Sequence, residues 1–526
     1  MGSDFSNLNQ KLSEINSVVS NMLNQNHDFF DHALSISTQD FLGWIDPEKL
    51  ISHFEEYSNI AKKYEFASYE KIFVIGMGGS SLGARVLIDN FLRNKKREVY
   101  FVDNYHPEFL RNLWENHAGS EIMFLVCSKS GNTLETLMIF EYFYQNVQQL
   151  NKNNSPGQSF IAITDQNSRL DSIAQSKNFA EIVYGVKEIG GRYSVLSCFG
   201  MFPALMSGVD SSDLIEALRD SLVEFRESGY FLQCEQLIKF ILEGLINDED
   251  KIFIDVDPQL SGFSEWIQQL IAESLGKNHK GIVPLIHNNY LEVYNSNNLI
   301  FSLKQDSIFS YDVVKSPLGS IFEVQLSNNN DLISQLFVWE IVVASLGVLT
   351  GTNPFDQPDV QLSKNETNYF IESNEKIEIL DNQISIDELI DCFENLDKNG
   401  YVGFLYFTNP QSNVPNLMNS LAYTLSLKFH IPVMQAIGPN YLHSLGQLFK
   451  GGPDKGTFIQ FVSSNVDQDI QVPHQNFSFY DLMNAQIQGE HKILNLIDRN
   501  PLVVNLGNEP EKKLEKFIGK VKLDGF

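Results

Sequence analysis

Short apolar runs, rich in β-branched and aromatic residues, alternate with longer helical segments along most of this chain. These runs occupy residues 71–76, 98–103, 121–128, 159–164, 251–256, 401–407, 431–438, 457–463 and 501–507. Most of them are followed by a stretch long enough for a crossover helix, which is the pattern of parallel strands covered by helices on both faces. The expected fold class is therefore α/β, with doubly wound, mainly parallel sheets.

The chain of 526 residues is long enough for several domains, and its apolar pattern changes along its length. Apolar residues recur at helical spacing in the first sixty residues, with a break at FLGWIDP. We expect an N-terminal helical arm, two α/β domains, and a C-terminal α/β segment that completes or flanks the second domain. The corresponding ranges are 1–64, 65–230, 231–370 and 371–526.

The charge and the cysteine content limit the possible binding partners and the expected cellular compartment of the protein. The formal net charge of −28 argues against nucleic acid and anionic membranes as partners, because both would be repelled. The apolar run at 337–349 contains Glu340 and is shorter than the roughly 20 residues needed to span a bilayer, so it predicts a buried helix. No secretory signal pattern opens the chain, and the four cysteines lack metal-ligand spacing. We expect a cytoplasmic protein with reduced thiols.

The stretch VIGMGGSSLG at residues 74–83 places glycines between an apolar strand and a helical segment. Backbone N–H groups there, from Gly79 onward, can converge on an anion at a helix N-terminus, and Ser80 and Ser81 add hydroxyl donors. A dinucleotide site is the weaker interpretation, because the spacing is not G-x-G-x-x-G and Asp103 is a poor ribose partner. The interpretation of this stretch as a tight strand-to-helix turn that binds no ligand also stays open.

The stretch CSKSGNTLET at residues 127–136 repeats this design after another strand. One helix cap would explain a single hydroxyl, but not a cluster of four around one glycine. Hydroxyl and amide donors suit a phosphate, and two such loops at one sheet edge indicate a ligand crevice. The candidate phosphate-binding residues of this stretch are Ser128, Lys129, Ser130, Thr133 and Thr136.

Three later segments carry polar residues whose roles the local sequence leaves open. Gln269 and Glu273 are four residues apart in a predicted helix, hence on one face, which is either its solvated side or part of a site. Without its surrounding motif, Lys364 would be interpreted as a lysine whose side chain is exposed to solvent. His443 lies among small residues, where a histidine is usually structural.

Six motifs together resemble the glucose-6-phosphate isomerase family, which has the sugar isomerase (SIS) fold. They are GMGGSSLG, SKSGNTLET, FLGWIDP, GGRYSVLS (190–197), FSEWIQQLIAESLGKNHKGIVP (263–284) and GTNPFDQPDVQLSK (351–364). A family histidine motif, approximately HSLGQ, normally precedes the lysine segment, but that interval holds only the unmatched His287. The motif stands at His443 instead, an order that resembles the isomerase half of bacterial transaldolase and glucose-6-phosphate isomerase fusions.

The resemblance assigns roles to the candidate residues. It implies that Glu273 is the base that moves a proton between C1 and C2, and that Gln269 orients the substrate. Arg192, expected to be exposed in a glycine-opened turn, would stabilise the enediolate. Lys364 and His443 would open the sugar ring, with His443 acting in its own subunit or in a neighbouring one. Apart from the resemblance, Lys277 lies one turn after Glu273 and is expected to balance its charge.

The function implied by the resemblance is the interconversion of glucose 6-phosphate and fructose 6-phosphate through a cis-enediolate. Neither a metal nor a cofactor is implied, and a homodimer is expected. One alternative is a dual glucose and mannose phosphate isomerase. Another is a non-catalytic phosphosugar-binding regulator, which would not need the glutamate helix or the ring-opening groups. Two interpretations of Lys450 stay open: it contacts a phosphate, or it is a solvent-exposed charge in a loop.

Overall fold

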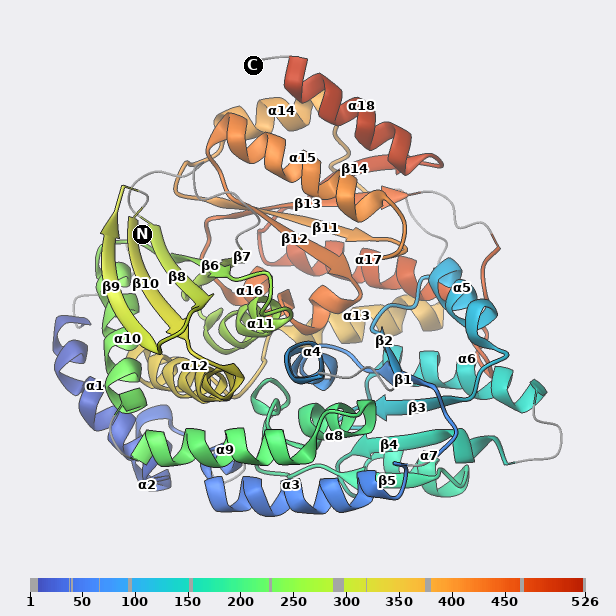
Figure 1. The fold of residues 1–526 in the computed structure, drawn as a ribbon. Coiled ribbons are helices and arrows are strands. Elements are labelled where there is room, and N and C mark those ends of the chain that lie inside the picture. Colours follow the sequence, from blue (N-terminus) through green and yellow to red (C-terminus); the bar gives the residue numbers. More distant parts are fainter. Residues whose placement is uncertain are drawn as a thin grey trace.

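The computed structural model describes residues 8–36, 38, 41–65, 67–92, 97–150, 155–226, 229–286, 298–317, 319–373, 380–463 and 468–523. The strands within these ranges form three sheets, which are mainly parallel. Figure 1 shows the sheets arranged around three central helices: α4 (Gly79–Phe91), α11 (Phe263–Leu275) and α16 (Gly446–Gly451). The predicted fold class, α/β with mainly parallel sheets, is confirmed, whereas the predicted domain boundaries stay a prediction.

The N-terminal segment is helical. Its elements are α1 (Leu8–Leu23), α2 (His27–Leu34), the 3-10 helix η1 (Gly43–Ile45) and α3 (Pro47–Lys62). The side chain of Asp46 accepts a hydrogen bond from the backbone N–H of Lys49 and so caps α3. In Figure 1, α3 runs along one border of the molecule toward the first sheet.

The first sheet has the order β2-β1-β3-β4-β5, and all its strands are parallel. They are β1 (Lys71–Ile75), β2 (Glu98–Val102), β3 (Ile122–Cys127), β4 (Phe160–Thr164) and β5 (Glu181–Tyr184). The helical elements of this region, besides α4, are α5 (Pro107–His117), α6 (Leu134–Leu150), η2 (Pro156–Ser159), α7 (Arg169–Ser176), η3 (Gly191–Tyr193) and α8 (Cys198–Ser207). Because β1 and β3 are neighbours, the GMGG and SKSGNT loops that follow them meet at one edge.

The second sheet has the order β7-β6-β8-β10-β9, with β9 antiparallel to β10. Its strands are β6 (Lys251–Val256), β7 (Val283–Ile286), β8 (Asn298–Gln305), β9 (Ser310–Ser316) and β10 (Gly319–Leu326). Three further helices accompany it with α11: α9 (Ser211–Arg226), α10 (Gly229–Ile246) and α12 (Asn329–Thr350). Within the described ranges, α12 alone is long and apolar enough to cross a membrane, and its most apolar window is wholly buried inside the protein, as a buried core helix would be.

The C-terminal segment forms a sheet of its own, with the order β12-β11-β13-β14 and all strands parallel. Its strands are β11 (Tyr401–Phe407), β12 (Val433–Gly438), β13 (Gly456–Ser463) and β14 (Leu502–Gly507). The helices before and within it, besides α16, are α13 (Val360–Ser373), α14 (Ile386–Asn395), α15 (Val414–Phe429), η5 (Asn440–His443), α17 (Phe479–Leu496) and α18 (Pro510–Leu523).

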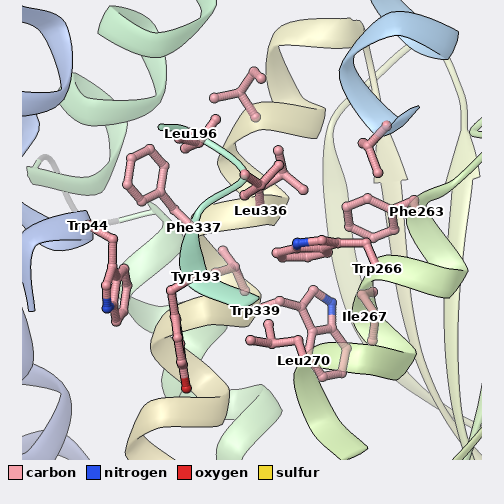
Figure 2. Packing of buried hydrophobic residues seen from close by; sticks show 14 of the residues in the cluster. Trp44, Tyr193, Leu196, Phe263, Trp266, Ile267, Leu270, Leu336, Phe337 and Trp339 are labelled. Atoms are coloured by element: carbon pink, nitrogen blue, oxygen red, sulfur yellow. The ribbon is translucent and has the colours of Figure 1, made fainter. Parts of the chain in front are cut away.

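The apolar face of α11 packs on α12, which decides where its polar face points. Figure 2 shows Trp266 and Leu270 of α11 beside Leu336 and Trp339 of α12, and all four are buried. Burying one such side chain contributes roughly 1.5–3 kcal/mol, so this contact fixes the rotation of the helix about its axis.

Aromatic contacts join three of the sequence motifs. Trp44 of the FLGWIDP stretch stacks on Tyr193 at 5.1 Å between ring centroids. Phe355, in the loop after α12, lies 5.5 Å from Tyr193 and 5.4 Å from Phe41. The N-terminal segment therefore holds the GGRYS turn against the GTNPF loop.

Candidate active site

Glu273 lies at the centre of a buried polar cluster. It is on α11 and is 5 % exposed. Gln269, one turn earlier, donates to Glu273 Oε1 at 3.3 Å, so the two side chains share a face as the spacing predicted. The Oε2 atom accepts from Arg192 Nη1 at 3.1 Å and from Gln357 Nε2 at 2.6 Å. This face of α11 is buried, which excludes the solvated-side interpretation.

Arg192 is buried, at 5 % exposure, and not exposed as its glycine-opened turn suggested. Its Nη2 donates to the carbonyl oxygens of Pro354 and Asp356 at 2.7 and 2.9 Å, and its Nε also donates to Pro354. These carbonyls and the Glu273 carboxylate satisfy the donors, so the guanidinium can leave water. The residues that enclose it come from a loop 162 positions away, which local sequence does not reveal.

Burial raises the pKa of Glu273 above its usual range, and the charge of Arg192 opposes that shift. A carboxylate with a raised pKa is suited to taking up and returning a proton near neutral pH. One turn later, burial and the nearby Arg192 lower the pKa of Lys277 to about 8. Its Nζ pairs with Asp356 Oδ1 at 2.8 Å, so Lys277 holds the same loop that encloses Arg192.

His443 ends η5, just beyond the carboxyl end of β12, and its ring contacts a second buried carboxylate. The Nε2 atom lies 3.0 Å from Oε1 of Glu135, which also accepts from Gln486 Nε2 at 2.6 Å. Tyr105 in turn donates to Gln486. Burial raises the pKa of Glu135, but the contact with His443 and the hydrogen bonds outweigh it and lower this pKa to about 2.

Glu135 and Gln357 contact His443 and Glu273 but were not predicted from the sequence. Glu135 stands inside the phosphate-loop stretch SKSGNTLET, where an acidic residue in the first turn of a helix is also an ordinary helix-end feature. Gln357 lies in GTNPFDQPD, whose glycine and prolines predict a loop. For both, the signal that could have found them was their place inside motifs already singled out.

Gln269 connects the Glu273 and His443 clusters. Its Nε2, besides donating to Glu273, donates to the backbone carbonyl of His443 at 2.8 Å. Gly78 permits this approach: a Cβ there would collide with the His443 carbonyl oxygen and the Gln269 amide, and its φ of +53° favours glycine. Gln269 therefore links the Glu273 carboxylate to the backbone of His443 within one chain.

A cavity of 510 Å³ opens beside His443. Its walls carry Ser130 and Thr133 of the SKSGNT loop, Lys364 on α13, and Gln486 on α17. Lys364 is exposed to solvent at this wall. The lining residues do not include Glu273, Arg192 or Gln269, which lie on the buried side of His443.

The two glycine-containing loops differ in their relation to this cavity: residues of the SKSGNT loop line it, whereas the lining residues include none of the GMGGSS loop. Gly79 packs directly against the carbonyl of Gly191, one residue before Arg192. In the second loop, the hydroxyls of Ser128 and Thr133 are 3.0 Å apart, and the Thr136 hydroxyl is buried without a hydrogen-bond partner in the described structure. Thr136 itself does not line the cavity, so its part in substrate binding stays a prediction.

Two lysines of the motifs form ion pairs with carboxylates. Lys129 Nζ pairs with Asp165 at 2.6 Å, so its part in substrate binding stays a prediction. Lys450 is buried and pairs with Glu490 at 2.6 Å, and Glu490 also accepts from Ser363 at 2.9 Å. Lys450 is therefore not a solvated loop charge; it anchors α13 next to Lys364.

The remaining candidates differ in how fully the structure places them. Ser80 and Ser81 lie in the first turn of α4, where Ser81 is buried. His287 lies outside the described residues. The cysteines are free thiols as expected, with Cys127, Cys198 and Cys234 buried and Cys392 half-buried.

Known proteins with similar sequences include glucose-6-phosphate isomerases. The phosphoglucose isomerase family profile matches residues 49–290. The glucose-6-phosphate isomerase of Methanocaldococcus jannaschii is 27% identical over 354 residues, which are 58% of this chain and 85% of that protein. The glucose-6-phosphate isomerase of Mesomycoplasma hyopneumoniae strain J is 26% identical over 402 residues, covering 65% of this chain and 94% of that protein.

Solved structures show the same fold. A hypothetical protein of Thermus thermophilus superposes with a TM-score of 0.57 at 20% identity, covering 69% of this chain and 97% of that one. A glucose-6-phosphate isomerase from Chlamydia trachomatis has a TM-score of 0.50 at 20% identity, with 64% and 74% covered. At this level of identity the likeness concerns the fold alone.

Proposed function

The chain belongs to the phosphoglucose isomerase family, and on that premise we propose that it interconverts glucose 6-phosphate and fructose 6-phosphate. The observation that carries the proposal is the polar cluster in which Gln269 bonds both Glu273 and the backbone of His443. This cluster joins a carboxylate base, paired with Arg192, to a histidine, paired with Glu135. A phosphosugar-binding regulator would need neither pair.

Ring opening is the first step of the proposed mechanism. The C1–O5 bond of the sugar breaks while a proton leaves the C1 hydroxyl and a proton reaches the ring oxygen. His443 and Lys364 face the same cavity and are the groups assigned to these two protons. Glu135 orients the His443 ring by binding its Nε2.

Proton transfer follows. Glu273 removes the proton from C2 of the open aldose, which leaves a cis-enediolate with its charge on O1. The O2 hydroxyl proton then passes to O1, and Glu273 returns its proton to C1 to give the ketose. The Arg192 guanidinium is held by the Pro354 and Asp356 carbonyls, so it can stabilise the enediolate without reorganising. The raised pKa of Glu273, caused by burial, suits both halves of this transfer.

A coupled assay with glucose, fructose and mannose 6-phosphates tests the proposal. We expect the wild-type protein to convert the first two, and Glu273→Gln to lower kcat by about 10³-fold, since a general base contributes roughly 10² to 10⁴. Unchanged thermal unfolding would show that the variant is folded. Conversion of mannose 6-phosphate would broaden the function to the dual isomerase, and wild-type turnover by Glu273→Gln would refute the role of Glu273.

We also propose that the protein is a cytoplasmic homodimer in which each subunit supplies its own histidine. The free cysteines and the net charge of −28 support the location, and the family resemblance supports the dimer. The contact between His443 and Glu135 within one chain supports the complete site in each subunit.

A further inference from the structure

We infer that Arg169 is a specificity-determining residue that binds the phosphate group of the substrate. This inference rests on the proposed function, because it takes the SKSGNT loop as the phosphate site. Arg169 is the first residue of α7 and lies on the wall of the 510 Å³ cavity together with Ser130 and Thr133.

The backbone of Arg169 is fixed against the SKSGNT loop by several contacts. A Cβ on Gly131, whose φ is +67°, would come within 2.6 Å of the Leu170 amide nitrogen and 2.7 Å of Ser168 Oγ. Thr164 donates to the Ser128 carbonyl at 2.7 Å and lies 2.8 Å from the Ser168 hydroxyl, which caps α7. The start of α7 and the loop are therefore one interlocked unit.

Two of the other cations near this loop already have partners. Lys129 pairs with Asp165, and Lys450 pairs with Glu490. No hydrogen bond or ion pair engages the side chain of Arg169 or Lys364 in the part of the chain that the structure describes. Since Lys364 lies on α13 and Arg169 follows β4 beside the hydroxyl donors, Arg169 is the cation placed for the phosphate.

The chemistry fits this assignment. A protein of net charge −28 repels a sugar phosphate unless a local cation offsets the field. Hydroxyl and amide donors select the shape of a phosphate but leave its charge unbalanced. A guanidinium adds two parallel N–H donors and a full positive charge, which also discriminates against unphosphorylated sugars.

The test compares the variants Arg169→Gln and Arg169→Lys with a control variant, Arg219→Gln. Arg219 is an exposed arginine of α9 that pairs with Glu55. For Arg169→Gln we expect about a tenfold higher KM for glucose 6-phosphate, equivalent to about 1.4 kcal/mol, with kcat within about twofold. Competitive inhibition by inorganic phosphate should weaken by the same factor. Arg169→Lys should lie between the two, and Arg219→Gln should match wild type.

A readout without turnover separates this inference from the proposed function. Inorganic phosphate should raise the unfolding temperature of the wild-type protein more than that of Arg169→Gln. Equal phosphate-induced shifts, or an unchanged KM and phosphate inhibition constant in Arg169→Gln, would overturn the role of Arg169 while leaving the isomerase intact. An inactive wild-type protein that still shows the difference in phosphate binding would overturn the isomerase and keep the phosphate site.

Discussion

The two sides of the candidate active site each contain a buried glutamate, but the pKa values of the two carboxyl groups are shifted in opposite directions. Glu273 faces Arg192 at 3.1 Å, and burial raises its pKa. Glu135 faces His443 at 3.0 Å, and although burial raises its pKa too, His443 and the hydrogen bonds lower it to about 2. Burial and a basic partner therefore do not by themselves set the protonation of a carboxylate.

The place of each residue on its helix acts in the same direction as these contacts. Glu135 is in the first turn of α6, where free backbone N–H groups and the helix dipole stabilise an anion. Glu273 is near the end of α11, which closes at Leu275, where the dipole disfavours one. In addition, Arg192 divides its donors between Glu273 and two carbonyls. The outcome is one carboxylate that can exchange protons and one that stays ionised to hold a histidine.

The first prediction, with the largest effect on activity, tests whether Glu273 and His443 of the same chain act together. We propose to co-express His443→Asn and Glu273→Gln chains with different tags and to purify the mixed complex through both tags. If each subunit is self-sufficient, every site carries one defect, and the activity stays at the low level of the separate variants. The measurement is kcat for glucose 6-phosphate, compared with wild type.

The alternative, in which His443 acts in the neighbouring subunit, predicts a higher activity. If His443 acted across the interface, each mixed dimer would contain one intact site, and about half of the wild-type activity would return. If no mixed complex forms and the wild-type protein is active as a monomer, the self-sufficient site stands and the dimer is wrong.

The second prediction concerns stability, where the two glutamates should respond to pH with opposite signs. The folded pKa of Glu135 is lowered, so it contributes stability above the ordinary value of 4.5 that is lost as the pH falls toward 2. The advantage of wild type over Glu135→Gln should shrink by about 2 kcal/mol between pH 6 and pH 3, at 1.36 kcal/mol per pH unit below 4.5. Urea unfolding at each pH measures it.

For Glu273 the folded pKa is raised, so its contribution is present below 4.5 and is lost as the pH rises through the folded value. The stability of wild type relative to Glu273→Gln should therefore fall with rising pH. The exposed Glu394 of α14 offers a matched control, since Glu394→Gln removes a surface carboxylate and should change stability little. Parallel slopes for the Glu135 and Glu273 variants would refute the comparison.

The sequence predicted the parts of this molecule that have a strong local pattern. The strands β1 to β4, β6 and β11 to β14 were predicted as apolar runs, whereas β5, β7, β8, β9 and β10 were not. Of these, β9 is an edge strand, SYDVVKS, with mostly exposed residues and little apolar signal. The spacing of Gln269 and Glu273 placed them on one face. The burial of Arg192 and the pairing of Glu135 with His443 depend on segments 162 and 308 positions away, which no local pattern encodes.

The last prediction concerns Lys277, on the Glu273 side of the site, where we expect a small effect. Burial and Arg192 lower the pKa of Lys277 to about 8, so above that pH its ion pair with Asp356 is lost. Because the Asp356 carbonyl accepts from Arg192, we expect kcat/KM to fall by about twofold to fivefold between pH 8 and 9.5, and Lys277→Met to lack this bend. Stability should move the other way, since the unfolded chain binds the extra proton between pH 8 and 10.5, so wild type gains stability relative to Lys277→Met. A fall in activity together with a fall in relative stability would instead indicate alkaline unfolding, and the assigned role of Lys277 would be wrong.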